Sequence, residues 1–269
     1  MSGAEGFPST VYGPVSSWRF GQSLGVDLLL HTSTCSFDCV YCQLGRIRKH
    51  TEEQAVYVPT DRVAEDLRAV NWDEVDVVTI SGNGEPTMAL NLGEVIALLK
   101  DEYRKPVHVL TNSTWLHDRA TRERLYRADV VACKLDAPDD GTLERVNRPV
   151  PGIGIARIVE GIKALRQDPG FRGRLALQCM FLGSNVAAAP RLAGLIAEIG
   201  PDEVQLNTPR RLYPRQWYLE ARGARDSTPP VPGIPLQTIG REEAREVERL
   251  LREANPDTRI VSIYRDNQE

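Results

Sequence analysis

The sequence predicts an α/β protein whose parallel sheet curls into a partial (β/α)6, TIM-like barrel. Six short β-like runs alternate with amphipathic, helix-like stretches over about residues 20–210. Strand–helix alternation of this kind implies a parallel sheet with right-handed crossovers. Because six units are fewer than the eight of a closed barrel, we expect the sheet to curl without closing fully.

Each expected element follows from its own pattern. The strands are expected at SLGVDLLL (23–30), VDVVTISG (75–82), PVHVLTN (106–112), DVVACKLDA (129–137), RLALQCMFL (174–182) and EVQLN (203–207). Helices are expected at TDRVAEDLRAV (60–70, with Thr60 or Asp61 as cap), NLGEVIALLKDEY (91–103), HDRATRERLYRA (117–128), GIARIVEGIKALRQ (154–167) and APRLAGLIAEIG (189–200). A closing helix (241–255) and a possible edge strand (258–264) are expected to end the chain.

Size and composition are those of an ordinary globular protein. We expect one domain over residues 1–269, with the barrel at about 20–210 and a C-terminal extension at 211–269. The net charge of −4 argues against nonspecific nucleic-acid binding by the whole surface. The first residues do not show the basic region followed by an apolar run that is typical of a signal peptide, and no segment approaches about 18 uninterrupted apolar residues. We therefore expect a cytoplasmic protein with no membrane partner.

Three of the five cysteines lie in one short stretch, TSTCSFDCVYCQLG (32–45). This stretch follows the first expected strand, so it should lie at the barrel mouth, where parallel barrels carry their chemistry. Thiolates at this spacing bind zinc or an iron–sulfur cluster. Zinc usually takes four ligands, and the candidates for the fourth, His31 and His50, are not at a customary zinc spacing. Three cysteines on a cubane cluster would instead leave one iron open to a ligand.

The pattern Cys-x-x-x-Cys-x-aromatic-Cys, formed by Cys35, Cys39, Tyr41 and Cys42, resembles the signature of the radical S-adenosylmethionine superfamily. The resemblance implies a [4Fe-4S] cluster whose open iron chelates S-adenosylmethionine. A reduced cluster would then cleave it to a 5′-deoxyadenosyl radical, with a flavodoxin- or ferredoxin-type protein as the one-electron reductant. Tyr41 would lie beside the adenine, with packing beneath the loop as the alternative.

A second motif, SGNGEPT (81–87), ends the second expected strand. Its glycines let the backbone approach a ligand closely, and its carbonyls and a carboxylate can receive an ammonium group. It resembles the Gly-Gly-Glu-Pro motif with which the superfamily holds the methionine amino group, here formed by Gly82, Asn83, Gly84, Glu85 and Pro86. A tight strand-to-helix turn is the alternative.

Alternation along the strands predicts which side chains face the barrel lumen. The expected lumen set is Thr79, Ser81, Thr111 or Asn112, Lys134, Asp136, Gln178, Met180, Gln205 and Asn207. Cys133 and Cys179 should face the helices as buried hydrophobes. By the resemblance, Asp136 and Gln178 become candidates to contact the ribose and the methionine carboxylate. For Lys134 we expect pairing with Asp136 or with a substrate carboxylate, and a Schiff-base lysine is the alternative.

The substrate class is less constrained. The segments 13–30, 35–46 and 134–149 resemble small proteins related to the wyosine-synthesising radical enzymes, but no cysteine precedes Cys35 to bind the second cluster of those enzymes. Residues 209–225 interleave arginines with aromatic residues, which suits either RNA binding or a flap that plugs the barrel. We therefore expect an enzyme acting on a nucleoside, free or within RNA, or on another small polar metabolite. A radical-installing activase and a non-catalytic iron–sulfur or zinc module remain the alternatives.

Overall fold

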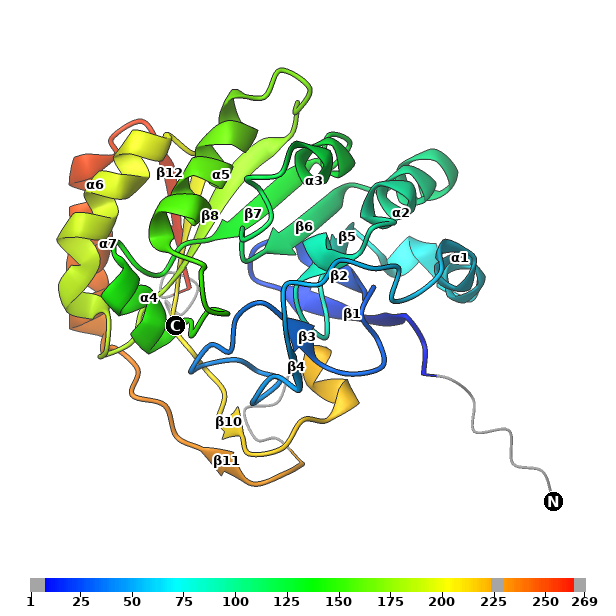
Figure 1. The fold of residues 1–269 in the computed structure, drawn as a ribbon, viewed down its shortest axis with the longest axis horizontal. Coiled ribbons are helices and arrows are strands. Elements are labelled where there is room, and N and C mark those ends of the chain that lie inside the picture. The colour runs from blue at the N-terminus through cyan, green and yellow to red at the C-terminus, as the bar shows by residue number, and fades with distance from the viewer. Residues whose placement is uncertain (1–7, 224–229, 264–269) are drawn as a thin grey trace.

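The structure is a computed structural model that describes residues 8–223 and 230–263. Its main sheet has eight strands in the order β1-β2-β5-β6-β7-β8-β9-β12 (Figure 1). Seven of these strands run parallel, and β1 pairs antiparallel with β2 at one edge. The bounds are β1 Val11–Ser17, β2 Gly21–Val26, β5 Val77–Ile80, β6 Val107–Thr111, β7 Val130–Lys134, β8 Arg174–Met180, β9 Glu203–Asn207 and β12 Arg259–Ser262.

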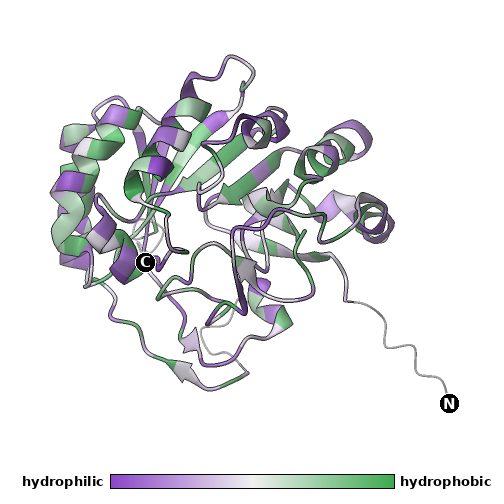
Figure 2. Ribbon diagram, viewed as in Figure 1, coloured by the Kyte–Doolittle hydropathy of each residue, from purple (hydrophilic) through white to green (hydrophobic). Residues whose placement is uncertain are grey.

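Helices follow the strands and cover the outer side of the curled sheet, from α1 at the right of Figure 1 to α7 at the left. They are α1 (Thr60–Leu67), α2 (Leu92–Leu98), α3 (Arg119–Arg124), α4 (Asp140–Val146), α5 (Ile155–Gln167), α6 (Ala189–Ile199) and α7 (Arg241–Ala254). Their apolar faces and one face of the strands form a single core, visible as green strands in Figure 2. Within the described residues, no helix is long and apolar enough to cross a membrane.

The predicted fold class is confirmed, and all six predicted strands are present in a sheet that curls into a half-barrel. The possible edge strand is present as β12, paired parallel with β9. Cys133 and Cys179 belong to the core beneath the helices, as strand alternation predicted. The predicted helices also form, and α2 continues as a π-helical turn, Leu99–Tyr103.

Three local predictions were wrong. β1 was missed because its Gly13-Pro14 pair is typical of a turn, yet an irregular edge strand tolerates proline. The first predicted strand ends at Val26 rather than at residue 30, since the buried leucines beyond it lie in a loop. The N-cap of α1 is Pro59, whose backbone is extended, so Thr60 is the first helical residue; its hydroxyl donates to Glu94 Oε2 at 2.8 Å.

The amino-terminal end of the half-barrel is filled by the turn between β1 and β2. The Phe20 ring packs edge-on against the His108 ring, with centroids 4.3 Å apart. Burial lowers the pKa of Arg19 to about 10, and Glu203 at the start of β9 opposes that shift. This filled end leaves the opposite, carboxyl end of the strands for the functional loops.

His108 is expected to make the stability of the protein depend on pH. Burial lowers its pKa to about 4, so the native state holds it neutral while the unfolded chain protonates near its usual value of about 6.5. Its contribution is therefore complete above that value and is lost as the pH falls toward about 4. Between about pH 7.5 and 5 the native protein should lose about 2 kcal/mol of unfolding free energy through this group, and His108→Gln, followed by urea unfolding at several pH values, should remove that loss and flatten the slope. An unchanged slope in the variant would contradict this assignment.

Candidate active site

The three clustered cysteines lie in the long segment between β2 and α1. Two short strands in this segment, β3 (Thr34–Cys35) and β4 (Lys49–His50), pair in parallel. Between them the Cys42 amide donates to the Cys39 carbonyl at 3.0 Å, which forms a tight turn. The Val40 amide donates to the Val146 carbonyl at 2.9 Å, which ties the turn to α4. The three thiols are partly buried in this one loop.

Burial raises the pKa of all three thiols. The pKa of Cys35 lies well above its usual value, with nearby Glu85 adding to the shift, and the pKa values of Cys39 and Cys42 rise to about 11 and about 12. Two sulfur atoms receive amide donors: Asn112 Nδ2 lies 3.5 Å from Cys35 Sγ, and Asn147 Nδ2 lies 3.4 Å from Cys39 Sγ. Binding of a metal group would therefore release protons from these thiols.

The chemistry of this donor set fits an iron–sulfur cluster. Within residues 8–223 and 230–263, no group of three or more His, Cys, Asp and Glu side chains is placed to hold a single metal ion. Three thiolates that each bind a different iron of a cubane cluster do not have to converge on one point. Amide donors at two of the sulfurs are the kind of outer contact that tunes such clusters.

The glycine motif after β5 pairs directly with the cysteine loop. The Thr34 amide donates to the Asn83 carbonyl at 2.8 Å, and the Glu85 amide donates to the Thr34 carbonyl at 3.1 Å. Gly84 has φ of +148°, and a Cβ there would lie 1.6 Å from the Thr34 carbonyl oxygen. Only glycine allows this approach. The two predicted motifs are therefore neighbours in space, and Pro86 begins the short helical turn that follows.

Glu85 lies behind the motif rather than at its surface. The residue is 2% exposed. Its carboxylate accepts hydrogen bonds from the Thr111 hydroxyl (2.6 Å), the Thr87 hydroxyl (2.6 Å) and the Asn112 amide (2.5 Å). Burial raises its pKa, whereas these hydrogen bonds act to lower it. We expected the Glu85 carboxylate to add negative charge for an ammonium group; in the structure it is buried and fixes the loop through these hydrogen bonds.

Asp136 and Tyr41 form a second fixed unit beside the cysteines. The Tyr41 hydroxyl donates to Asp136 Oδ2, and Asn147 Nδ2 donates to the same oxygen at 2.8 Å. The other carboxylate oxygen accepts from the Met180 amide at 2.7 Å. This side chain is 0% exposed, and its hydrogen bonds hold Tyr41, Asn147 and the Met180 amide together; the contact between Asp136 and a ribose stays a prediction. Tyr41 itself is partly exposed, with its ring next to the cysteine loop.

Three further predicted residues lie toward the lumen. Lys134 Nζ lies 3.2 Å from Asp136 Oδ1 and 4.9 Å from the centre of the Tyr41 ring, but the geometry at Asp136 is not that of a hydrogen bond. Lys134 thus pairs with Asp136 by charge and keeps its N–H donors available. Gln178 donates weakly to Gln205, at 3.4 Å, and Asn207 is partly exposed at the end of β9.

Residues 208–223, which we call the strap, cross from the end of β9 to the edge near β1 and β2 (Figure 1). Trp217 Nε1 donates to Asn83 Oδ1 at 3.1 Å, and its ring lies against the guanidinium of Arg48, 4.8 Å from the ring centre. Arg222 pairs with the buried carboxylate of Asp27 at 3.1 Å. The strap therefore packs on the cysteine loop and the glycine motif.

Two residues of the strap that suited RNA binding make contacts within the protein, while RNA binding by the other arginines of the segment stays a prediction. Arg222 is 9% exposed and also donates to the Ser9 carbonyl at 2.7 Å, so its charge is neutralised inside the protein. Trp217 is likewise held by Asn83 and Arg48 rather than free to stack on a base. Arg225, included in the predicted basic segment, lies outside the described residues.

Sequence reasoning missed Asp27 and Asn147. Asp27 accepts from Asn83 Nδ2 at 2.7 Å and from the Leu29 amide at 2.9 Å, so one carboxylate joins the strap to the glycine motif. Its signal was present, since it is the only charged residue in the apolar run SLGVDLLL. Asn147 bridges Cys39, Tyr41 and Asp136, and no local pattern predicts those three contacts.

Comparisons with known proteins identify the family and the fold of this chain. The family model of the Radical SAM superfamily matches residues 29–168. A UPF0026 protein of Synechocystis sp. is 45% identical over 224 residues, 83% of this chain and 83% of that protein.

Two solved structures share the fold. TYW1 with a lysine-pyruvate adduct bound matches with a TM-score of 0.62 at 14% identity, over 88% of this chain and 75% of that one. SuiB of Streptococcus suis bound to S-adenosylmethionine matches with a TM-score of 0.60 at 14% identity, over 90% of this chain and 50% of that one. At such identities these two likenesses show the fold alone.

Proposed function

Because this chain belongs to the radical SAM superfamily, whose enzymes use a [4Fe-4S] cluster and S-adenosylmethionine, we propose that it abstracts hydrogen from an organic substrate held in the barrel lumen. When bound and reduced, the cluster supplies the electron that cleaves S-adenosylmethionine to a 5′-deoxyadenosyl radical. One observation carries the proposal: the cysteine loop and the glycine motif pair through Thr34, which brings a three-thiol site beside a backbone that can hold an ammonium.

The residues of this chain divide into binding and positioning groups. Cys35, Cys39 and Cys42 would hold the cluster. The backbone of residues 82–86 would receive the methionine ammonium, and Tyr41 would lie beside the adenine. Asn112 supports the cysteine loop, since its side-chain amide donates to Cys35 and, at 2.8 Å, to Ser36.

The substrate we propose is a small polar molecule, with a free nucleoside included. Lys134 supports this choice because its Nζ is buried without a hydrogen-bond partner and can receive a carboxylate or phosphate of the substrate. Gln178 and Asn207, on neighbouring strands, offer amide groups to S-adenosylmethionine or the substrate. The internal bonds of Arg222 and Trp217 favour a small substrate over a base within RNA. A one-electron donor protein completes the reaction.

Cleavage of S-adenosylmethionine is the activity that tests the proposal. The protein is reconstituted anaerobically with iron and sulfide, reduced with dithionite, and supplied with S-adenosylmethionine. We expect 5′-deoxyadenosine to form, together with methionine. The Cys42→Ala variant should reduce this product to background, because one ligand of the cluster is lost. The matched control is Cys133→Ala, which removes a thiol buried under the helices and should leave product formation intact.

Iron analysis of each sample separates the possible outcomes. Wild-type protein that holds a full complement of iron but yields no 5′-deoxyadenosine above the Cys42→Ala sample would overturn the radical chemistry and favour a non-catalytic iron–sulfur module. A Cys133→Ala sample that loses iron as completely as Cys42→Ala would show that the assignment of the ligands is wrong.

A further inference from the structure

The chain at and beyond the end of α4, residues 146–150, runs beside residues 36–40 of the cysteine loop. Backbone hydrogen bonds join the two segments, from the Val40 amide to the Val146 carbonyl (2.9 Å), from the Asp38 amide to the Asn147 carbonyl (3.0 Å) and from the Val150 amide to the Ser36 carbonyl (2.9 Å). These bonds lie on both sides of Cys39 and of Asn147. The position of Asn147 relative to that cysteine is therefore fixed by the backbone.

The side-chain amide of Asn147 faces the Cys39 sulfur. The residue is 1% exposed, and its Nδ2 lies 2.8 Å from Asp136 Oδ2, 3.1 Å from the Tyr41 hydroxyl and 3.4 Å from Cys39 Sγ. The other hydrogen-bond partners of the Asp136 carboxylate donate to it. The nitrogen of Asn147, and not its oxygen, is thus assigned to the side that faces this carboxylate and the sulfur. A fixed N–H donor therefore lies at one of the three thiols.

A donor at a ligand sulfur affects how readily an iron–sulfur cluster is reduced. Reduction makes the cluster and its thiolate ligands more negative, and a hydrogen bond is stronger when its acceptor carries more negative charge. An N–H donor therefore favours the reduced state and raises the reduction potential. The negative charge of Asp136 acts in the opposite direction, but Lys134 Nζ lies 3.2 Å from Asp136 Oδ1 and offsets that charge.

We propose that Asn147 is a positioning residue that raises the reduction potential of the cluster through its hydrogen bond to Cys39 Sγ. The inference rests on the proposed function, because it needs the cluster that the three cysteines would hold. One electron passes from the donor protein to the cluster, no covalent bond is made or broken, and Asn147 keeps its protons. The amide thus eases the electron transfer that must precede cleavage of S-adenosylmethionine.

The reduction potential of the reconstituted protein tests the inference, measured by a dye-mediated titration that is followed by electron paramagnetic resonance. Asn147→Leu removes the N–H donor and leaves little room for a water molecule to replace it. We expect the equilibrium constant for one-electron reduction to fall by about three- to tenfold, and a tenfold fall lowers the potential by about 59 mV. A cluster-bearing Asn147→Leu protein with an unchanged potential would overturn this inference alone, whereas wild-type protein that binds no cluster would overturn the proposed function with it.

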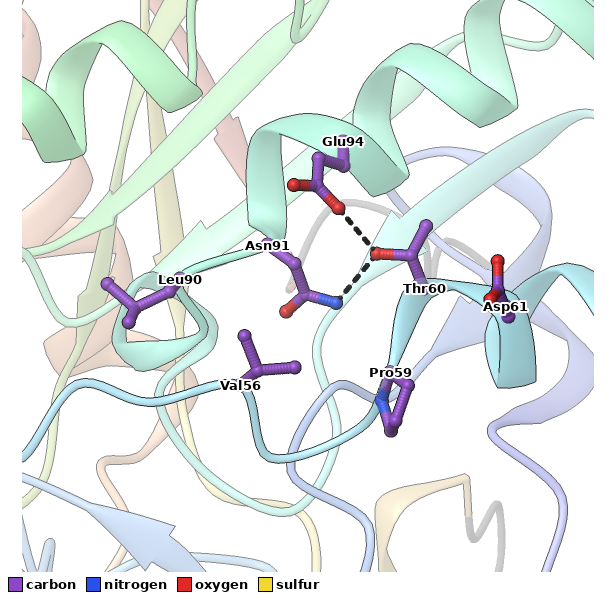
Figure 3. A pocket seen from close by; sticks show the side chains of 7 residues that line it. All are labelled: Val56, Pro59, Thr60, Asp61, Leu90, Asn91 and Glu94. Atoms are coloured by element: carbon purple, nitrogen blue, oxygen red, sulfur yellow. Dashed lines mark hydrogen bonds between the residues drawn. The ribbon is translucent and has the colours of Figure 1, made fainter.

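Asn91 offers a matched control, because its side-chain amide is buried and used in the same way without a cysteine partner (Figure 3). The residue is 3% exposed, and its Nδ2 donates to the Val58 carbonyl at 2.9 Å and to the Thr60 hydroxyl at 3.0 Å. In both asparagines Oδ1 is buried without a hydrogen-bond partner. Asn91→Leu should therefore lower the stability to urea as Asn147→Leu does, but leave the potential unchanged. Equal shifts of the potential in the two variants would show that a loosened fold, and not the lost donor, is the cause.

A spectroscopic measurement keeps the inference testable if Asn147→Leu does not hold a cluster. The protein is labelled with ¹⁵N only in the side-chain amides of asparagine, and pulsed electron paramagnetic resonance of the reduced protein detects ¹⁵N nuclei coupled to the cluster. Asn112 is the other expected source of such a signal, since its Nδ2 lies 3.5 Å from Cys35 Sγ. The spectrum is therefore also recorded for Asn112→Ala, in which we expect the Asn147 coupling to persist. Loss of all ¹⁵N coupling in that variant would overturn the inference.

Discussion

Replacing Gly84 by alanine is expected to lower the free energy of unfolding by about 4 kcal/mol or more, at the upper end for single substitutions. The new Cβ would lie 1.6 Å from the Thr34 carbonyl oxygen, so the two chains must separate. Separation breaks the hydrogen bonds by which Thr34 joins Asn83 and Glu85. The cysteine loop then loses its seat on the glycine motif. Urea unfolding measures the stability, and iron content after reconstitution measures the integrity of the loop.

Gly152→Ala is the control for this substitution. Gly152 also has a positive φ, +94°, but a Cβ there would meet nothing within 4 Å. It should therefore cost only the backbone strain of about 1–2 kcal/mol and leave iron binding unchanged. If Gly84→Ala cost no more than Gly152→Ala, the close approach to Thr34 would not be a feature of the folded protein.

The second large effect is expected from Arg222→Leu. Removing the Arg222 guanidinium leaves the Asp27 carboxylate buried without its cation. Breaking one side of a buried ion pair typically lowers the free energy of unfolding by about 3–5 kcal/mol. Asp27 also holds Asn83, so the glycine motif should loosen, and the KM for S-adenosylmethionine should rise more than kcat falls. Arg215→Leu, an exposed change in the same strap, should alter stability by less than about 0.5 kcal/mol.

A double variant separates charge from packing. Adding Asp27→Asn to Arg222→Leu removes the uncompensated charge. The double variant should therefore lose less free energy of unfolding than the sum of the losses of the two single variants. Strict additivity of the two effects would show that the ion pair does not contribute as a unit.

Local patterns predicted the architecture because buried parallel strands appear in the sequence as short apolar runs, such as VVTI at β5 and VVACK at β7. The cysteine spacing and the glycine turn are also local, which is why both motifs could be identified before the structure. Alternation along β7 placed Cys133 and Lys134 on opposite faces correctly. The face of the sheet on which a strand side chain lies is thus predictable where one face of the strand is buried.

The partners of each side chain were not predictable. Asp27 and Arg222 are 195 positions apart, and Asn83 and Trp217 are 134 apart, so no short window contains either pair. Asp136 follows the carboxyl end of β7, as predicted, but its buried carboxylate accepts hydrogen bonds from Tyr41 and Asn147, which no local pattern indicates. These outcomes depend on tertiary contacts, which override local preference.

The distance along the chain between the cysteine loop and the strap also sets an order of events during synthesis. The loop is complete once Cys42 has been added, whereas Arg222 and Trp217 follow much later. At ribosomal speeds of about 5–20 residues per second, roughly ten to forty seconds separate the two. During that interval the nascent thiols exist without the covering that the strap gives them in the finished protein. The growing chain thus passes through a stage in which the loop is made but not yet enclosed.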